Sequence, residues 1–296
     1  MRRAILLGSL LILAFGCAGE RARQYELRGQ ILAIDGQNGT VTIRHSDIKG
    51  FMPAMTMPFK VKDRKLLEGR QRGDVVAGTL VVTDSDVYLT RLDVTGHGDV
   101  VQVGTRPPLV ADVLQPGSAV PDVRLVEASG RTLQLSSLRG FVLALTFIYT
   151  RCPLPQFCPL MDRQFAAVLQ RVRGDARLRG SVRMLSISFD PEYDTLDVLD
   201  AHARRVGADG TLWRFATADR PTIDVFAPRF GMVVMREDGG GITHNLRTAI
   251  IDRQGRLVKI YDGSDWTADQ LVADLVKAAG TQGQRSNGEA RQRTGT

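Results

Sequence analysis

Between residues 26 and 94, apolar positions alternate with polar ones in short runs separated by turn-forming residues, a pattern that predicts β-strands. No convincing helical periodicity interrupts these runs. Five short strands in so short a segment predict a small, closed, OB-like barrel over residues 26–96. The predicted strands are Glu26–Ile34, Thr40–His45, Phe59–Val61, Val75–Val82 and Val87–Val94.

From residue 119 onward, longer apolar runs alternate with amphipathic stretches. Phe141–Tyr149 and Val182–Phe189 are almost unbroken apolar runs, which is typical of strands covered on both faces. Hairpins are predicted around Gly130 and Gly255. The order of elements predicts a thioredoxin-like α/β domain over 119–279. The predicted helices are Pro159–Val172, Thr195–Val206, Thr222–Phe230 and Thr267–Ala279.

Three further segments have their own character. Two arginines precede an apolar run from Ala4 to Phe15, which is typical of a secretory signal and too short to span a membrane as a helix. The segment 97–118 contains several glycines and prolines and is predicted to be a linker. The polar segment 280–296 is predicted to be a disordered tail.

The end of the signal allows two interpretations. Leu13-Ala14-Phe15-Gly16-Cys17 resembles a bacterial lipoprotein signal, which implies a lipid anchor on Cys17, although the leucine comes one place early and Phe15 is bulky. An ordinary cleavage site after Gly16 is the alternative. In both cases we expect the mature chain to work outside the cytoplasm, on the periplasmic face.

The net charge of +7 comes mostly from arginines spread along the chain. Nucleic-acid binding needs a clustered basic patch with interleaved aromatic residues, and the sequence has none. We therefore expect no nucleic-acid partner.

Methionines gather in the first domain. Met52, Met55 and Met57 fall within six residues, a few positions after His45. Thioethers are soft, neutral ligands, and beside an imidazole they suit Cu(I) or Ag(I) better than hard dications. Because strand side chains alternate faces, His45 can meet Met55 and Met57 if their strands are neighbours. The alternative is that the methionines fill a core and the histidine is a buried, hydrogen-bonded residue.

The run from Val41 to His45, followed by Met-Pro-Ala-Met-Thr-Met-Pro-Phe, resembles the CusF-type periplasmic copper-binding domain over about residues 26–94. The resemblance implies a five-stranded barrel with Cu(I) at the Met/His site. In that family a tryptophan often stacks against the metal. Met52 stands at the matching position here, as a candidate fourth ligand or an apolar lid, and the chain's two tryptophans, Trp213 and Trp266, lie in the other domain.

A second set of soft ligands lies in the second domain. Cys152 and Cys158 follow a predicted buried strand, and Cys158 precedes a helix, whose N-terminus favours thiolate. His244 lies just before the strand Leu246–Asp252, which in a thioredoxin-like sheet approaches the cysteine loop. Two thiolates and an imidazole would bind Cu(I) and, with an added ligand, Cu(II).

The cysteine pair has other interpretations. It could form a structural disulfide, with an unrelated histidine on the surface. A structural zinc site would need four protein ligands, and the sequence offers three. A cysteine protease would need an orienting third residue and an oxyanion hole, which the sequence does not indicate, and no clear signature of a thioredoxin-fold peroxidase surrounds Cys152.

Several runs resemble the Sco/SenC proteins, thioredoxin-fold copper chaperones associated with assembly of the binuclear copper centre of cytochrome c oxidase. The resemblance covers about residues 119–278 and implies copper ligation by Cys152, Cys158 and His244. Family members usually have three residues between the cysteines, and this chain has five. Asp190 is expected to support the site or form a turn. The matching runs are Phe147–Cys152, Cys158-Pro159, Ser188–Thr195 and Thr243-His244.

The sequence thus predicts an exported copper metallochaperone, with cytochrome c oxidase subunit II as the expected acceptor and a membrane anchor at Cys17. A thiol–disulfide oxidoreductase that reduces the acceptor's cysteines is the alternative from the same residues, and would make the protein an enzyme. A periplasmic copper buffer that needs no acceptor is a further alternative.

Overall fold

The structure is a computed structural model that describes residues 22–100, 113–236 and 240–280. The predicted signal at 1–17 with Cys17, most of the predicted tail and the middle of the predicted linker lie outside these residues. Within the described ranges, no helix has the length and apolar character needed to cross a membrane.

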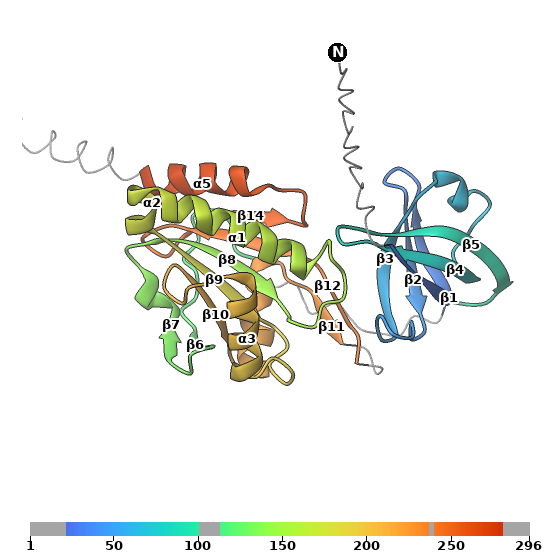
Figure 1. The fold of residues 1–296 in the computed structure, drawn as a ribbon, viewed down its shortest axis with the longest axis horizontal. Coiled ribbons are helices and arrows are strands. Elements are labelled where there is room, and N and C mark those ends of the chain that lie inside the picture. The colour runs from blue at the N-terminus through green and yellow to red at the C-terminus, as the bar shows by residue number, and fades with distance from the viewer. Residues whose placement is uncertain (1–21, 101–112, 237–239, 281–296) are drawn as a thin grey trace, which may run out of the picture.

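The first domain is a closed barrel, as predicted. Its strands follow the order β1-β2-β3-β5-β4, with β1 returning to β4 and β3 pairing in parallel with β5 (Figure 1). Inward positions are buried and alternate with more exposed ones along each strand. The strands are β1 (Arg23–Asp35), β2 (Thr40–His45), β3 (Met55–Val61), β4 (Asp74–Val82) and β5 (Val87–His97).

Only β2 has the predicted bounds, and the other four barrel strands are longer than the sequence predicted: β1 begins at Arg23 rather than Glu26 and ends at Asp35, and β4 begins one residue earlier, at Asp74. β3 begins at Met55 rather than Phe59, because Pro58 sits at an exposed position of the strand and pairs with Thr42 without ending the ladder. β5 continues past Val94 to His97, the first residue of the predicted linker. A short 3₁₀ helix at Arg64–Leu67 follows β3.

The second domain is built on a seven-stranded sheet in the order β14-β13-β8-β9-β10-β6-β7. β8, β9 and β10 run parallel, whereas β13 is antiparallel to β8. This is the predicted thioredoxin-like arrangement. The strands are β6 (Arg124–Glu127), β7 (Thr132–Gln134), β8 (Val142–Ile148), β9 (Val182–Ser188), β10 (Trp213–Thr217), β13 (Arg247–Ile251) and β14 (Leu257–Asp262).

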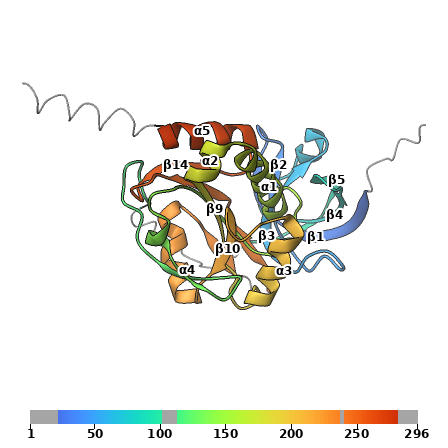
Figure 2. The same cartoon turned by 60° about the vertical axis from the view of Figure 1, so that its left-hand side comes forward.

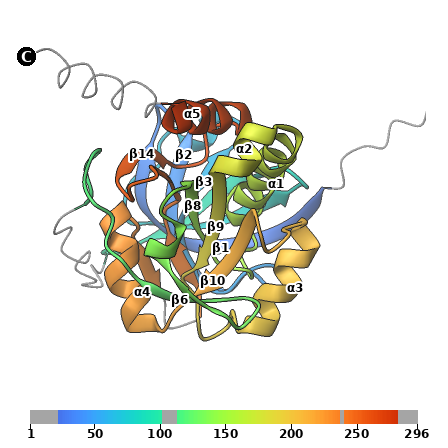
Figure 3. The same cartoon turned by 90° about the vertical axis from the view of Figure 1, so that its left-hand side faces the viewer.

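Helices cover both faces of this sheet. α5 lies on one side of the strands and α4 on the other (Figure 3). On the α1 face, Phe165 packs 5.8 Å from Trp213 between ring centroids. On the opposite face, Phe147 of β8 packs against Phe226 and Phe230. The helices are α1 (Cys158–Gly174), α2 (Ala176–Ser181), α3 (Leu196–Val206), α4 (Arg220–Phe226) and α5 (Ala268–Gly280).

Some short elements were not predicted. α2 has six residues, and β11 (Val234–Arg236) and β12 (Ile242–His244) form a separate two-stranded sheet of three-residue strands. α1 begins at Cys158, one residue before the predicted start, and Gly280, expected beyond the last helix, is its final residue. These differences place both Cys158 and His244 at the ends of regular elements.

The barrel lies beside the layered domain (Figures 1 and 2). The end of the predicted linker is fixed to the second domain, because Leu114 N–H donates to the carbonyl of Arg229 and Gly117 N–H to that of Leu257. The two domains also touch directly. Thr243 of β12 donates its hydroxyl hydrogen to the backbone carbonyl of Thr56 in β3.

Candidate metal centres

The structure brings the three predicted thiol and imidazole residues together. Cys152 lies in the turn after β8, and Cys158 is the first residue of α1, and both are buried. The two Sγ atoms and a ring nitrogen of His244 lie within 4.8 Å of one another. The cysteines are free thiols, so the structural-disulfide interpretation does not describe this structure.

His244 is held in a defined orientation. Its Nδ1 lies 2.8 Å from the carbonyl oxygen of Asn245, and because a carbonyl only accepts, Nδ1 carries the hydrogen. Nε2 is then the ring nitrogen that faces the thiols, and it lies 4.0 Å from Cys158 Sγ. The rings of Tyr149 and Phe189 pack against the imidazole at 5.3 and 4.9 Å between centroids. These contacts fix the imidazole with Nε2, rather than Nδ1, on the side of the two cysteines.

The two thiols do not share the same proton affinity. Burial raises the pKa of Cys152, but hydrogen bonding from Cys158 and the nearby His244 outweighs it and holds this pKa well below the usual value. Burial and the neighbouring Cys152 raise the pKa of Cys158 well above its usual value. The expected thiolate at the helix N-terminus is thus displaced to Cys152, because two adjacent buried negative charges repel each other.

Buried carboxylates hold the cysteine loop. Asp194 accepts hydrogen bonds from the Thr150 backbone and hydroxyl and from the Ser188 hydroxyl. Burial raises the pKa of Asp194 despite these bonds. Asp190 accepts from Arg151 Nε at 2.8 Å, so it supports the loop through the residue before Cys152. The sequence singled out Asp190 but not Asp194.

A cavity of about 320 Å³, lined by both polar and apolar side chains, adjoins the cysteines. Among its lining residues, His202 Nε2 lies 2.8 Å from a carboxylate oxygen of Asp162, and both side chains are buried. Asp162 is one helical turn after Cys158, and it contributes to the raised pKa of that thiol. Sequence reasoning missed this pair. The one available signal was the spacing of four residues, which puts Asp162 and Cys158 on the same face of α1.

The barrel residues also come together. His45 pairs directly with Met55 across β2 and β3, and Met57 pairs with Ile43. Directly opposed side chains lie on the same face with Cβ atoms about 5 Å apart. His45, Met55 and Met57 are all buried inside the barrel. Their role as ligands stays a prediction.

His45 has the same local arrangement as His244. Its Nδ1 lies 2.8 Å from the carbonyl oxygen of the next residue, Ser46, which assigns the hydrogen to Nδ1 and the lone pair to the buried Nε2. The Phe59 ring packs edge-on at 5.5 Å between centroids. Met52 is also buried and pairs with Ile48 at an isolated bridge, so a lid or fourth-ligand role for it stays a prediction.

Gly29 of β1 pairs with His45 of β2, on the edge of β2 away from Met55. A Cβ at this position would lie 2.5 Å from the carbonyl oxygen of Arg44 and 2.9 Å from the Cα of His45. Both distances are too short for real contacts. The close approach of β1 to β2 beside the histidine therefore requires glycine.

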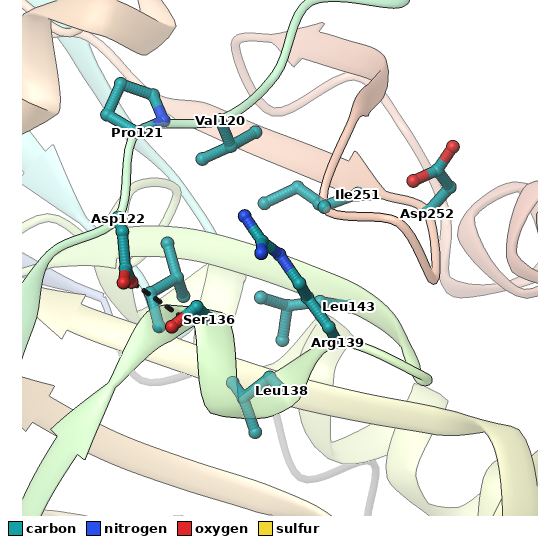
Figure 4. A pocket seen from close by; sticks show the side chains of 11 residues that line it. Val120, Pro121, Asp122, Ser136, Leu138, Arg139, Leu143, Ile251 and Asp252 are labelled. Carbon is teal, nitrogen blue, oxygen red and sulfur yellow. Dashed lines mark hydrogen bonds between the residues drawn. The ribbon is translucent and has the colours of Figure 1, made fainter.

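A second cavity lies away from these groups. It is lined by residues that include Asp122, Ser136 and Arg139, and Asp122 accepts a hydrogen bond from the Ser136 backbone (Figure 4). Leu143, another lining residue, is near the start of β8, whereas the cysteines follow its end. This cavity is lined mainly by apolar side chains, and no cysteine, methionine or histidine is among its lining residues.

Two family models match the chain. The model of the SCO1/SenC family matches residues 112–280, which is more than half of the chain. The model described as the copper binding periplasmic protein CusF matches residues 24–94. Together the matches account for both domains and indicate copper as the metal. They agree with both resemblances inferred from the sequence.

Individual relatives match the second domain. The SCO1 protein homolog of Bacillus subtilis is 28% identical over 156 residues, covering 51% of this chain and 78% of that protein. A SCO1/SenC family lipoprotein from Bacillus anthracis has 22% identity and a TM-score of 0.50, covering 55% of this chain and 96% of that one. A structure described as a putative electron transfer protein from Aquifex aeolicus has 21% identity, a TM-score of 0.50, and coverage of 58% and 98%. At these identities the two structures show the shared fold.

Proposed function

The chain belongs to the SCO1/SenC family, and from that premise we propose that it is an exported copper metallochaperone with one copper site in each domain. The observation that carries the proposal is the convergence of two thiol sulfurs and an imidazole nitrogen within 4.8 Å. The proposed ligands are His45, Met55 and Met57 in the barrel, and Cys152, Cys158 and His244 in the thioredoxin-like domain.

The two ligand sets suit the same metal in different ways. Two thioethers and an imidazole make a neutral site, which discriminates against hard dications and favours Cu(I). Two thiolates and an imidazole make an anionic site, which binds Cu(I) and, with one more ligand, accommodates Cu(II). The tether between the domains keeps the local concentration of one site near the other on the order of millimolar.

The proposed acceptor is the copper centre of cytochrome c oxidase subunit II, on the strength of the Sco/SenC resemblance. The proposed location is the periplasmic face, with a lipid anchor at Cys17. Support comes from the signal pattern at residues 1–17, from the periplasmic CusF family and from the lipoprotein description of the similar Bacillus anthracis structure.

Titration with Cu(I) against a chromophoric chelator tests the proposal. We expect two equivalents to bind the native chain. X-ray absorption should show sulfur ligands around copper in the native chain. Their number should be smaller in the Met55→Ala/Met57→Ala variant, where only the thiolate site remains. A single equivalent that disappears on Cys152→Ala would remove the barrel from the mechanism. In cells, deletion should lower the copper content of the oxidase, whereas copper sensitivity with normal oxidase would favour a buffer.

A thiol–disulfide oxidoreductase is a second candidate, favoured by the unequal thiols. A lowered pKa at Cys152 beside a raised one at Cys158 is the pattern of an attacking and a resolving cysteine. In that case Cys158→Ser should trap a mixed disulfide between Cys152 and a cysteine peptide from the acceptor. A pair that exchanges slowly with such a peptide would exclude turnover.

A further inference from the structure

One strand connects the two candidate sites. β12 ends at His244, and the preceding residue, Thr243, donates a hydrogen bond to the carbonyl of Thr56. Thr56 lies between Met55 and Met57 in β3. Figure 1 shows the β11–β12 hairpin reaching from the layered domain to the β3 side of the barrel. A ligand of each site is thus next in sequence to a residue of this contact.

The contact is close enough to exclude a side chain. An ideal Cβ on Gly241 would lie 2.4 Å from the carbonyl oxygen of Ala54 and 2.8 Å from the Cβ of Met55. The first neighbour is backbone and cannot turn aside as a flexible side chain would. Alanine at position 241 would therefore push β12 away from the methionine strand.

We propose that Gly241 and Thr243 form a docking seam that aligns the methionine site with the Cys/Cys/His site, so that Cu(I) passes from one to the other within the docked chain. This inference rests on the two copper sites of the proposed function. It adds the route of transfer between the sites, the strand β12 that creates this route, and Gly241, whose missing side chain allows the close contact.

The transfer is a ligand exchange without electron transfer. Bonds from copper to the two thioethers and to His45 Nε2 break as bonds to the two cysteine sulfurs and His244 Nε2 form, and copper stays Cu(I) throughout. Any proton on either cysteine thiol passes to solvent water as its sulfur binds copper. Movement toward the thiolates is favoured because the cation leaves a neutral ligand set for an anionic one.

The experiment uses the full chain with one equivalent of Cu(I). The Cys152–Cys158 pair is first held as a disulfide, so that copper binds the barrel, and a phosphine reductant then opens the thiols. Thiolate-to-copper absorption in the ultraviolet reports arrival at the second site. The same reduction followed without copper shows how fast the thiols become available.

The matched variants are Gly241→Ala and Gly36→Ala. Gly36 lies in the turn between β1 and β2, and a Cβ there meets nothing within 4 Å. We expect transfer in the native chain at a rate independent of protein concentration. Gly241→Ala should slow it about tenfold or more, since small misplacements of reacting groups have effects of this size, while Gly36→Ala should leave it unchanged. Thr243→Val, which lacks the hydroxyl, should slow it less.

The outcomes separate the two proposals. Equal rates in the native, Gly241→Ala and Thr243→Val chains, with both sites still binding copper, would overturn the docking seam and leave the metallochaperone proposal standing. A native chain that binds no Cu(I) in the barrel would overturn both. Retained Cu(I) affinity at each site in Gly241→Ala, together with slow transfer, would support the seam and show that the variant is folded.

Discussion

The two candidate metal centres use the same histidine arrangement on very different frameworks. In both, Nδ1–H donates to the carbonyl of the following residue at 2.8 Å, and Nε2 is the proposed ligand atom. In the barrel, the partners of His45 come from the neighbouring strand through regular pairing. In the second domain, His244 and Cys158 are 86 residues apart and meet through a loop, a helix start and a hairpin. The same hydrogen bond from Nδ1 to the next residue's carbonyl thus orients a histidine both in a regular barrel sheet and in a site assembled from distant segments.

The sites differ most in charge. The proposed barrel ligands are neutral, whereas in the cysteine site the pKa of Cys152 is lowered and that of Cys158 is raised, so Cys158 would have to lose its proton on binding metal. The barrel site should therefore be nearly indifferent to proton concentration around neutrality, and the cysteine site should not.

The largest effect that separates the sites should come from Cys152→Ser/Cys158→Ser. Without either thiolate the second site should lose its copper equivalent, because hydroxyl groups are hard, weak ligands for Cu(I). Competition titration with a chelator measures this, and the barrel equivalent serves as the internal control. Loss of both equivalents would mean that the sites are not independent.

A smaller loss is expected from Met57→Leu. The side chains have similar volumes, so the change should cost less than about 1.5 kcal/mol in the free energy of unfolding. The Cu(I) affinity of the barrel should fall at least about 100-fold, since even outer partners of metal ligands change affinity by 10–100-fold. Met184→Leu, at a buried position of β9, is the matched control. Unchanged affinity in Met57→Leu would return this methionine to the role of core filler.

The pH dependence should separate the sites by about tenfold per pH unit. Burial and the adjacent Cys152 raise the pKa of Cys158, so copper binding releases a proton there, and affinity rises with pH up to that raised pKa. The barrel affinity should stay flat above neutral pH. Parallel chelator titrations across pH, with the cysteine variant reporting the barrel alone, make the measurement. Identical slopes would contradict the assigned ligands.

The smallest effect should follow Asp194→Asn. The asparagine side chain has an NH₂ group where the aspartate has an accepting oxygen, and this group would face one of the hydrogen-bond donors of Thr150 or Ser188. The free energy of unfolding should therefore fall by about 1–3 kcal/mol. Copper affinity at the cysteine site should fall by a few fold. Because burial raises the pKa of Asp194, its favourable contribution is present at acid pH and lost as pH rises through that pKa. Denaturant unfolding across pH tests this, with the exposed Asp197→Asn as control. A variant as stable as the control would exclude the loop-holding role.

Much of this architecture was predictable because it follows from local patterns. Alternation placed the five barrel strands, and unbroken apolar runs located β8 and β9. The convergence of His45 with Met55 and Met57 needed only strand pairing. The start of β3 was missed because Pro58 usually ends a strand, and here it is tolerated at an exposed position.

Other features depend on tertiary contacts that the sequence does not encode locally. β11 and β12 are three residues each, too short to show periodicity, so His244 was expected in a loop. The displacement of thiolate character to Cys152 arises from burial and the proximity of two sulfurs. The buried Asp162–His202 pair joins α1 and α3 through residues 40 positions apart.

The missing side chain at Gly29 has a consequence for anyone transplanting this site into another barrel. Copying His45 and its methionine partners would not be sufficient, because the recipient's own residue beside the histidine would spread the first two strands and shift the imidazole. A transplanted site must therefore include Gly29, although this residue is not among the proposed metal ligands.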